Sequence, residues 1–246
     1  NNKKFAYAKL IHLIQPSAQR QAPACQYVSL EENACTGCPW MIADYTSQLE
    51  QKRNRFVYAM KRVGFDTTQL TISAVHPAPQ TYRYRNRCQL KTDGVQLGFI
   101  SEHSHQIAPI DDCIVLNDSC RNLLKTTLMQ LPNTAWQSDP GKDFNVIELD
   151  DELPPEAIHI NQKRPFKQGN TSQNLWMQSW LRQKLAQNTA LGKVVELFCG
   201  SGNFTQIIAE SNCTAILAYE SESSAIQSLK ARNFAKVNPQ VADLFQ

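Results

Sequence analysis

The chain has 246 residues, 42% of them hydrophobic and 19% charged, and a net charge of +3. This composition is typical of a globular protein with one large core or two modest ones, and it does not by itself indicate nucleic-acid binding. The sequence shows neither a signal peptide nor a transmembrane run. We therefore expect a cytoplasmic protein without a membrane partner, in which disulfides are disfavoured.

Positive charge is nevertheless concentrated in one part of the sequence. Between Glu50 and Lys91, nine basic residues stand against two acidic ones, which gives a local net charge of +7 and leaves −4 for the rest of the chain. Such a concentration indicates a polyanionic partner such as RNA.

The first two thirds of the sequence predict an α+β region. Residues 3–14 predict one strand, and a helix is expected from Pro39 to about Val63, where Gly64 ends it. A short helix is expected over residues 118–130. The other segments predict strands over residues 69–75, 82–91, 95–101, 106–110, 144–149 and 157–160, with a hairpin turn at Asp93-Gly94.

The predicted strand 82–91 has the sequence Tyr-Arg-Tyr-Arg-Asn-Arg-Cys-Gln-Leu-Lys. Alternate residues of a strand share a face, so one face would carry the basic side chains while the other packs on a core. Guanidinium groups suit phosphates geometrically. We expect RNA contact by Arg83, Arg85, Arg87 and Lys91. The alternative is a solvated strand face whose charge serves solubility.

From Phe166 onward, helices and strands alternate. Helices are expected over residues 171–187, 203–209 and 222–236, and strands over residues 194–198, 214–219 and 241–245. Parallel strands joined by helical crossovers predict an α/β fold with a doubly wound sheet.

A predicted buried strand, a glycine turn and a helix meet at Gly200. Together with Gly202, this turn predicts a nucleotide-binding crossover, in which glycines let a ligand approach the backbone closely. Glu220 follows twenty residues after Gly200, where a carboxylate can accept hydrogen bonds from both ribose hydroxyls. Thr205 stands where a dinucleotide fingerprint has its third glycine, which disfavours a nicotinamide or flavin enzyme. The alternative is an α/β turn without a ligand.

The chain has eight cysteines. Cys35 and Cys38 form a Cys-x2-Cys turn that can point two thiolates at one metal, and Gly37 lets this loop wrap closely. The others in apolar or strand contexts are interpreted as buried small hydrophobes: Cys88, Cys120, Cys199 and Cys213. We assign no nucleophilic role to Cys199.

Three stretches resemble one known family. Residues 196–205, Glu-Leu-Phe-Cys-Gly-Ser-Gly-Asn-Phe-Thr, resemble the first S-adenosylmethionine motif of the RNA uracil-5-methyltransferases, which make 5-methyluridine in ribosomal and transfer RNA. Residues 166–170, Phe-Lys-Gln-Gly-Asn, are similar to the family's Phe-x-Gln-x-Asn signature, although Asn170 is also an N-cap candidate. Residues 84–87 are similar to a Tyr-Arg-Asn-Arg stretch of the family.

The resemblance implies three parts of the chain. Residues 1–20 would be the last strand of a TRAM-like β-barrel and a linker, and residues 21–165 an α+β iron–sulfur and RNA-binding domain. Residues 166–246 would be the N-terminal part of a Rossmann-like S-adenosylmethionine-dependent methyltransferase domain. The implied cofactor-binding residues are Gln168, Phe198, Gly200, Gly202, Asn203, Glu220 and Asp243.

The cysteine array is similar to that of family members with an iron–sulfur cluster, which place three cysteines early and a fourth after a β-rich segment. The resemblance implies a [4Fe–4S] cluster held by Cys25, Cys35, Cys38 and Cys113, although the first spacing is longer than in much of the family. Four thiolates also suit structural zinc, which stays open as the alternative.

The family's mechanism implies residues that the sequence does not contain. A cysteine thiolate adds to carbon 6 of uracil, and carbon 5 then attacks the methyl group of the cofactor. The loop that carries this cysteine and the glutamate base are expected beyond Gln246. The expected protein is a monomeric methyltransferase of 23S rRNA. The alternatives are a tRNA substrate, or a non-catalytic iron–sulfur RNA-binding protein that retains a cofactor pocket.

Overall fold

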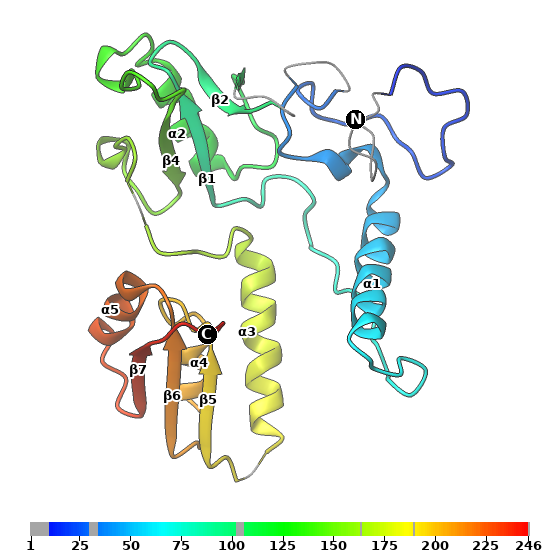
Figure 1. Ribbon diagram of the computed structural model, residues 1–246, viewed down its shortest axis with the longest axis vertical. Coiled ribbons are helices and arrows are strands. Elements are labelled where there is room, and N and C mark those ends of the chain that lie inside the picture. Colours follow the sequence, from blue (N-terminus) through cyan, green and yellow to red (C-terminus); the bar gives the residue numbers. More distant parts are fainter. Residues whose placement is uncertain (1–9, 30–33, 102–105, 163, 189, 246) are drawn as a thin grey trace. The chain divides into compact units, whose positions relative to one another are not determined.

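The computed structural model describes residues 10–29, 34–101, 106–162, 164–188 and 190–245, and it divides into two compact units (Figure 1). The first unit comprises Asn1–Arg83 and Cys88–Asn161, and the second comprises Tyr84–Arg87 and Gln162–Gln246. A four-residue segment is therefore contributed to the second unit from within the first. Of the predicted strand 3–14, residues 3–9 lie outside the described residues and residues 10–14 are not in a strand.

The first unit is built on a four-stranded sheet in the order β3-β2-β1-β4. Hairpin β1–β2 is antiparallel and turns at Asp93-Gly94 as predicted, with Gly94 at a φ of 87°. Along β1 the side chains of Cys88, Leu90 and Thr92 point into the core. The four strands are β1 (Arg87–Thr92), β2 (Leu97–Ile100), β3 (Ile107–Pro109) and β4 (Asn145–Asp150).

Helix α2 (Asp118–Leu128) packs against this sheet. The Asn117 side chain caps it by accepting a hydrogen bond from the N–H of Cys120 at 2.9 Å. Leu124 and Cys120 are fully buried, which confirms that Cys120 is a small core residue. Short 3-10 turns at Thr134–Trp136 and Pro155–Ala157 complete this part of the unit.

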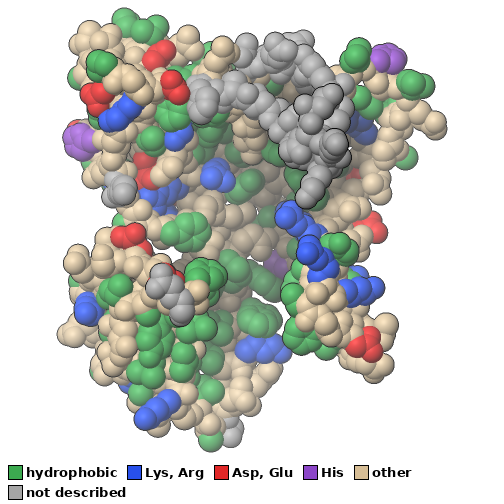
Figure 2. Space-filling view, in the orientation of Figure 1, with side chains coloured by type: hydrophobic (Ala, Val, Ile, Leu, Met, Phe, Trp, Pro, Cys, Tyr) green, Lys and Arg blue, Asp and Glu red, His purple; other side chains and the backbone are tan. Residues whose placement is uncertain are grey.

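The long helix predicted from Pro39 to about Val63 is interrupted near its start. A 3-10 turn (Pro39–Ile42) precedes α1 (Tyr45–Arg62), because Asp44 has an extended backbone and accepts a hydrogen bond from the N–H of Ser47 at 2.8 Å as the N-cap. Lys and Arg side chains gather over α1 (Figure 2).

Two predicted strands of this unit are wrong. Residues 69–75 form no strand, because the chain here runs alongside α1: Arg53 donates to the carbonyl of Ile72 at 3.0 Å. Residues 157–160 make only an isolated bridge between Ile160 and Ile147, since the 3-10 turn begins at Pro155.

The second unit has a parallel sheet in the order β5-β6-β7, with the alternation of helices and strands that the sequence predicts. Strand β7 lies earlier than predicted, at Val237–Val241 rather than 241–245. Pro239 is tolerated there because β7 is an edge strand of the described sheet. The other elements are α3 (Thr171–Ala186), β5 (Lys193–Leu197), α4 (Thr205–Ala209), β6 (Ala215–Glu220) and α5 (Ser223–Ala231).

The core of this unit lies on one face of the sheet. Ile216 and Ala218 of β6 are fully buried there with Ile226 and Leu229 of α5. On the other face, β5 is exposed where the sequence predicts a buried strand, with Val195 58% accessible, because none of the described helices covers that face. None of the described helices has the length and apolar character needed to span a membrane.

Candidate functional site

A tight backbone turn follows β5. Three residues of this turn adopt positive φ angles: Phe198 at 59°, Gly200 at 54° and Gly202 at 95°. A side chain at Gly202 would place its Cβ 2.6 Å from Cδ1 of Leu229, so the turn packs directly on α5. The predicted strand–turn–helix crossover is therefore confirmed. A Cβ at Gly200 would meet no atom within 4 Å, so the backbone is accessible there, whereas Gly202 is buried.

Glu220 stabilises this turn from the end of β6. Its Oε2 accepts a hydrogen bond from the N–H of Gly200 at 3.0 Å, and its Oε1 accepts from the N–H groups of Ser221 at 2.8 Å and Glu222 at 3.1 Å. Burial would raise the pKa of Glu220, but the N–H groups of Glu222 and Gly200 outweigh it and lower the pKa. The carboxylate at the turn is thus charged at neutral pH.

Arg232, which the sequence analysis missed, holds the same turn from α5. Its guanidinium donates to the carbonyls of Gly202 at 2.9 Å and Ser201 at 3.3 Å and contacts the side chain of Gln206. The guanidinium also lies over the Phe234 ring, 4.8 Å from its centroid. The role of Arg232 could not be predicted from the sequence, because no local pattern identifies an arginine thirty positions after a glycine turn as its partner.

Asn203 joins the turn to α3. Its side-chain amide exchanges two hydrogen bonds with Asn174, at 2.8 and 3.0 Å, and accepts a third from Gln178 at 2.9 Å. Asn203 therefore stabilises the position of the turn relative to the helix that precedes β5.

Thr205 has a structural reason to replace a third glycine. Its fully buried hydroxyl donates to Oε2 of Glu196 at 2.6 Å. Burial raises the pKa of Glu196, and the hydrogen bond from Thr205 opposes that rise. A glycine here would remove the partner of a half-buried carboxyl group.

The other predicted cofactor residues are Phe198, Asp243 and Gln168. The Phe198 ring is 57% exposed and lies 5.7 Å from the Phe245 ring, between centroids. Asp243 accepts a hydrogen bond from the N–H of Phe245 at 2.9 Å. Gln168 is half-buried in the segment before α3.

The two shorter motifs meet in the second unit through Asn86. The buried side chain of Asn86 donates to the carbonyl of Gln168 at 2.9 Å and to the hydroxyl of Thr171 at 2.8 Å. The backbone N–H of Asn86 donates to the carbonyl of Gly169 at 3.1 Å. Asn170 accepts from the N–H of Gln173 at 3.0 Å, which confirms it as the N-cap of α3. The Tyr-Arg-Asn-Arg stretch thus fixes the backbone that carries Gln168.

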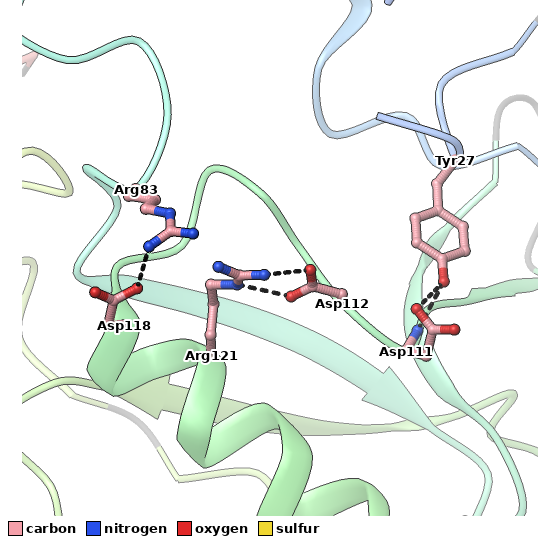
Figure 3. A network of polar contacts seen from close by, with 6 residues as sticks. All are labelled: Tyr27, Arg83, Asp111, Asp112, Asp118 and Arg121. Carbon is pink, nitrogen blue, oxygen red and sulfur yellow. Dashed lines mark hydrogen bonds and ion pairs between the residues drawn. The ribbon is translucent and has the colours of Figure 1, made fainter. Parts of the chain in front are cut away.

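The predicted basic strand is shorter than expected. Strand β1 begins at Arg87. Arg83 has a φ of 53°, which is not a strand conformation, so the alternation of faces does not extend back to Arg83. Arg83 pairs with Asp118 at 3.2 Å (Figure 3), Arg87 donates to the carbonyl of Pro165, and Lys91 lies 5.2 Å from the Phe144 ring centroid. Arg87 and Lys91 share a face of β1 as predicted, whereas Arg83 and Arg85 precede it.

The segment carrying Cys113 is tied to the cysteine loop. The Tyr27 hydroxyl contacts the Asp111 carboxylate and accepts from the N–H of Asp111 at 3.0 Å (Figure 3). The Cys35 N–H donates to the carbonyl of Tyr27 at 2.9 Å. Arg121 binds Asp112 with a 2.8 Å hydrogen bond through Nε and lowers the pKa of that carboxyl group.

These contacts bring three of the four predicted ligands into electrostatic range. Burial raises the pKa values of Cys35 and Cys113, and the proximity of Cys25 raises both further. All four predicted ligands are half-buried, and none forms a disulfide with a described residue: Cys25, Cys35, Cys38 and Cys113. Within the described residues, no group of three or more His, Cys, Asp or Glu side chains is arranged as a formed metal site.

Comparison with known proteins gives consistent matches. A family profile for tRNA (uracil-5-)-methyltransferases matches residues 148–241. A Nitrosomonas europaea protein named as an RNA methyltransferase is 54% identical over 245 residues, which is 62% of its length. The 23S rRNA (uracil(1939)-C(5))-methyltransferase RlmD of Halomonas elongata is 24% identical, and the match covers 98% of this chain and 62% of that enzyme.

Residues 148–241 match the tRNA (uracil-5-)-methyltransferase family, and the relatives above are named as RNA methyltransferases. A Clostridium acetobutylicum RNA methyltransferase is 36% identical over 68% of the chain and 35% of its own length. The chain thus spans less than two thirds of the length of these relatives.

Cys199 lies in the backbone turn that follows β5. It is 5% exposed, and burial, followed by the charges of Glu196 and Glu220, raises the pKa of its thiol to about 11. Because the thiolate is the nucleophilic form, this environment opposes a nucleophilic role and agrees with our reading of Cys199 as a buried small hydrophobe.

Alkylation tests this account of Cys199. A pKa near 11 in place of 9.0 leaves about 100-fold less thiolate at pH 8. We therefore expect iodoacetamide to modify Cys199 at least about 100-fold more slowly in the native protein than in urea, measured by peptide mass spectrometry. The variant E196Q, which removes one of the two charges, should react faster than the parent protein. Equal rates in native and unfolded protein would contradict this account.

Proposed function

We propose that this chain forms the cofactor- and RNA-binding part of an S-adenosylmethionine-dependent enzyme that methylates carbon 5 of uracil in RNA. The observation that carries the proposal is the turn at Gly200, whose accessible backbone lies against the charged carboxylate of Glu220. The match of residues 148–241 to the tRNA (uracil-5-)-methyltransferase family supports the reaction. We propose 23S rRNA as the substrate because the Halomonas relative that matches 98% of the chain is named for it.

The cofactor would supply an electrophilic methyl group, and the residues of the turn would hold it. Oε2 of Glu220 accepts one described hydrogen bond, from the N–H of Gly200, whereas Oε1 accepts three, so Oε2 is the oxygen that would accept from the ribose hydroxyls. The exposed ring of Phe198 would pack against the cofactor, and Asp243 would lie near the adenine. We assign contacts to the same ligand to Gly200, Gly202, Asn203 and Gln168. Asn203 would act mainly by positioning the turn.

The RNA would bind along the basic residues that precede and begin β1. Arg85 is exposed and forms no ion pair with a described residue, so its guanidinium is available to a phosphate. Each of the other three basic residues already contacts a group of the protein: Arg83, Arg87 and Lys91. They would bind RNA by giving up that contact or by contacting a phosphate in addition to it. The nucleophile and base would be supplied from outside this sequence, and the protein would act as a cytoplasmic monomer.

We also propose a [4Fe–4S] cluster bound by Cys25, Cys35, Cys38 and Cys113. The donor set fits such a cluster chemically, because it offers four thiols outside disulfides, and the proximity of Cys25 raises the pKa values of Cys35 and Cys113. The bound cluster would join the cysteine loop to the Cys113 segment through its iron–thiolate bonds. The contacts of Tyr27 with Asp111 already hold these two segments together.

Calorimetry with S-adenosylhomocysteine tests the cofactor assignment. The parent chain should bind S-adenosylhomocysteine and not NADH, and E220A should lower the affinity about 10- to 100-fold, as expected for the loss of charge-assisted hydrogen bonds. The matched control is E210A, which removes an exposed carboxylate of the same unit that pairs with Arg182. Equal affinity of E220A and E210A would contradict the assigned role of Glu220.

Metal analysis tests the cysteine assignment. Protein purified without oxygen should contain about four iron and four acid-labile sulfide per chain, as a [4Fe–4S] cluster requires. Substituting Cys38 by serine should reduce both contents strongly, whereas C213A, which changes a buried core cysteine, should leave them unchanged. Stoichiometric zinc in place of iron would overturn the cluster assignment.

A further inference from the structure

Three residues form an exposed stripe along α1. Arg55, Tyr58 and Arg62 follow one another at spacings of three and four, so they share one side of the helix. Tyr58 is 63% exposed, and the Arg62 guanidinium lies over its ring, 6.0 Å from the centroid. We call Arg55, Tyr58 and Arg62 the α1 stripe.

The α1 stripe lies opposite the side of the helix that packs on the protein. That packed side carries the hydrogen bond from the N–H of Ala78 to the Tyr45 hydroxyl, at 2.7 Å, and the bond from Arg53 to Ile72. Leu49 and Met60 on the same side are half-buried. The α1 stripe is therefore not used to hold the helix in place.

The charge of the helix is not compensated within its own length. Helix α1 has five basic residues and one acidic residue, a net charge of +4. Neither Arg55 nor Arg62 forms an ion pair with any residue that the structure describes. By contrast, Arg121 and Arg182 each have a carboxylate partner.

We infer that the α1 stripe binds single-stranded RNA, with the two guanidinium groups on separate phosphates and a base stacked on Tyr58. This inference rests on the proposed function for the presence of an RNA substrate. Seven residues of helix separate the two arginines by about 10 Å, far enough for each to bind its own phosphate. An exposed aromatic ring between cations is the arrangement that holds unpaired bases in proteins that bind single strands.

The chemistry of the α1 stripe favours RNA over a protein partner. A protein interface is depleted of charge at its centre and surrounds its aromatic residues with apolar ones. Here the aromatic residue lies between two uncompensated positive charges, which would be costly to bury against an apolar surface. A polyanion with flat bases satisfies both features at once.

Fluorescence anisotropy with a labelled single-stranded RNA 20-mer at several salt concentrations tests this inference. The double variant R55Q/R62Q should bind at least 10-fold more weakly, and its slope of log affinity against log salt should fall by about 1.4, or about 0.7 for each lost phosphate contact. Y58A should weaken binding about 5- to 100-fold by removing a stacked base, and Y58F should restore it.

The matched control is the double variant K142Q/R182Q. It removes two exposed positive charges that are already paired with Asp139 and Glu210. Its salt slope should stay close to that of the parent chain. Equal losses in both double variants, or no loss in R55Q/R62Q, would overturn the inference, and the latter result is also expected if α1 binds a protein instead.

The same preparations separate this inference from the proposed function. None of the α1 variants should change the affinity for S-adenosylhomocysteine, because α1 contributes no residue to the glycine turn. If the parent chain bound RNA through the α1 stripe but failed to bind S-adenosylhomocysteine, the proposed function would fail while the RNA surface stood.

Discussion

The backbone turn after β5 is the constraint on which the functional part of this chain depends. Its left-handed conformation is free of strain at the two glycines but costs roughly 1–2 kcal/mol at Phe198. Bonds from separate elements offset this cost: Glu220 binds the turn from β6 and Arg232 from α5. The parallel sheet is therefore needed to bring the two partners to one loop, and the loop in turn leaves accessible backbone beside a charged carboxylate.

A second constraint joins segments that are far apart in sequence. Asn86 binds the start of α3 at Gln168 and Thr171, and Asn174 in the first turns of the same helix binds Asn203. Helix α3 therefore connects the Tyr-Arg-Asn-Arg stretch to the turn. This arrangement explains why a short segment within the first unit belongs structurally to the second. Asn86, which belongs to the strand predicted over residues 82–91, instead holds the backbone that precedes α3.

The sequence predicts what local chemistry determines. The hairpin at Asp93-Gly94 and the cap of α3 at Asn170 follow from residue types whose geometry is set within a few positions. The carboxylate at Glu220 is predicted from its fixed spacing after the glycine turn, with which it forms a hydrogen bond. The sequence misses what depends on distant partners. Residues 69–75 have strand-like composition but pack beside α1, and β7 begins four residues earlier than predicted and includes Pro239, which its place at the sheet edge permits. Arg232 and Asn86 carry no local signal for their roles.

Hydrogen–deuterium exchange with and without S-adenosylhomocysteine tests the central claim most directly, because it locates the ligand on the chain. If the turn and Glu220 form the cofactor site, the ligand should slow exchange at the amides of residues 198–203 and 220–222, while the amides of α1 should not change. Protection confined to another part of the chain, or no protection at saturating ligand, would contradict the assignment of this turn as the cofactor site.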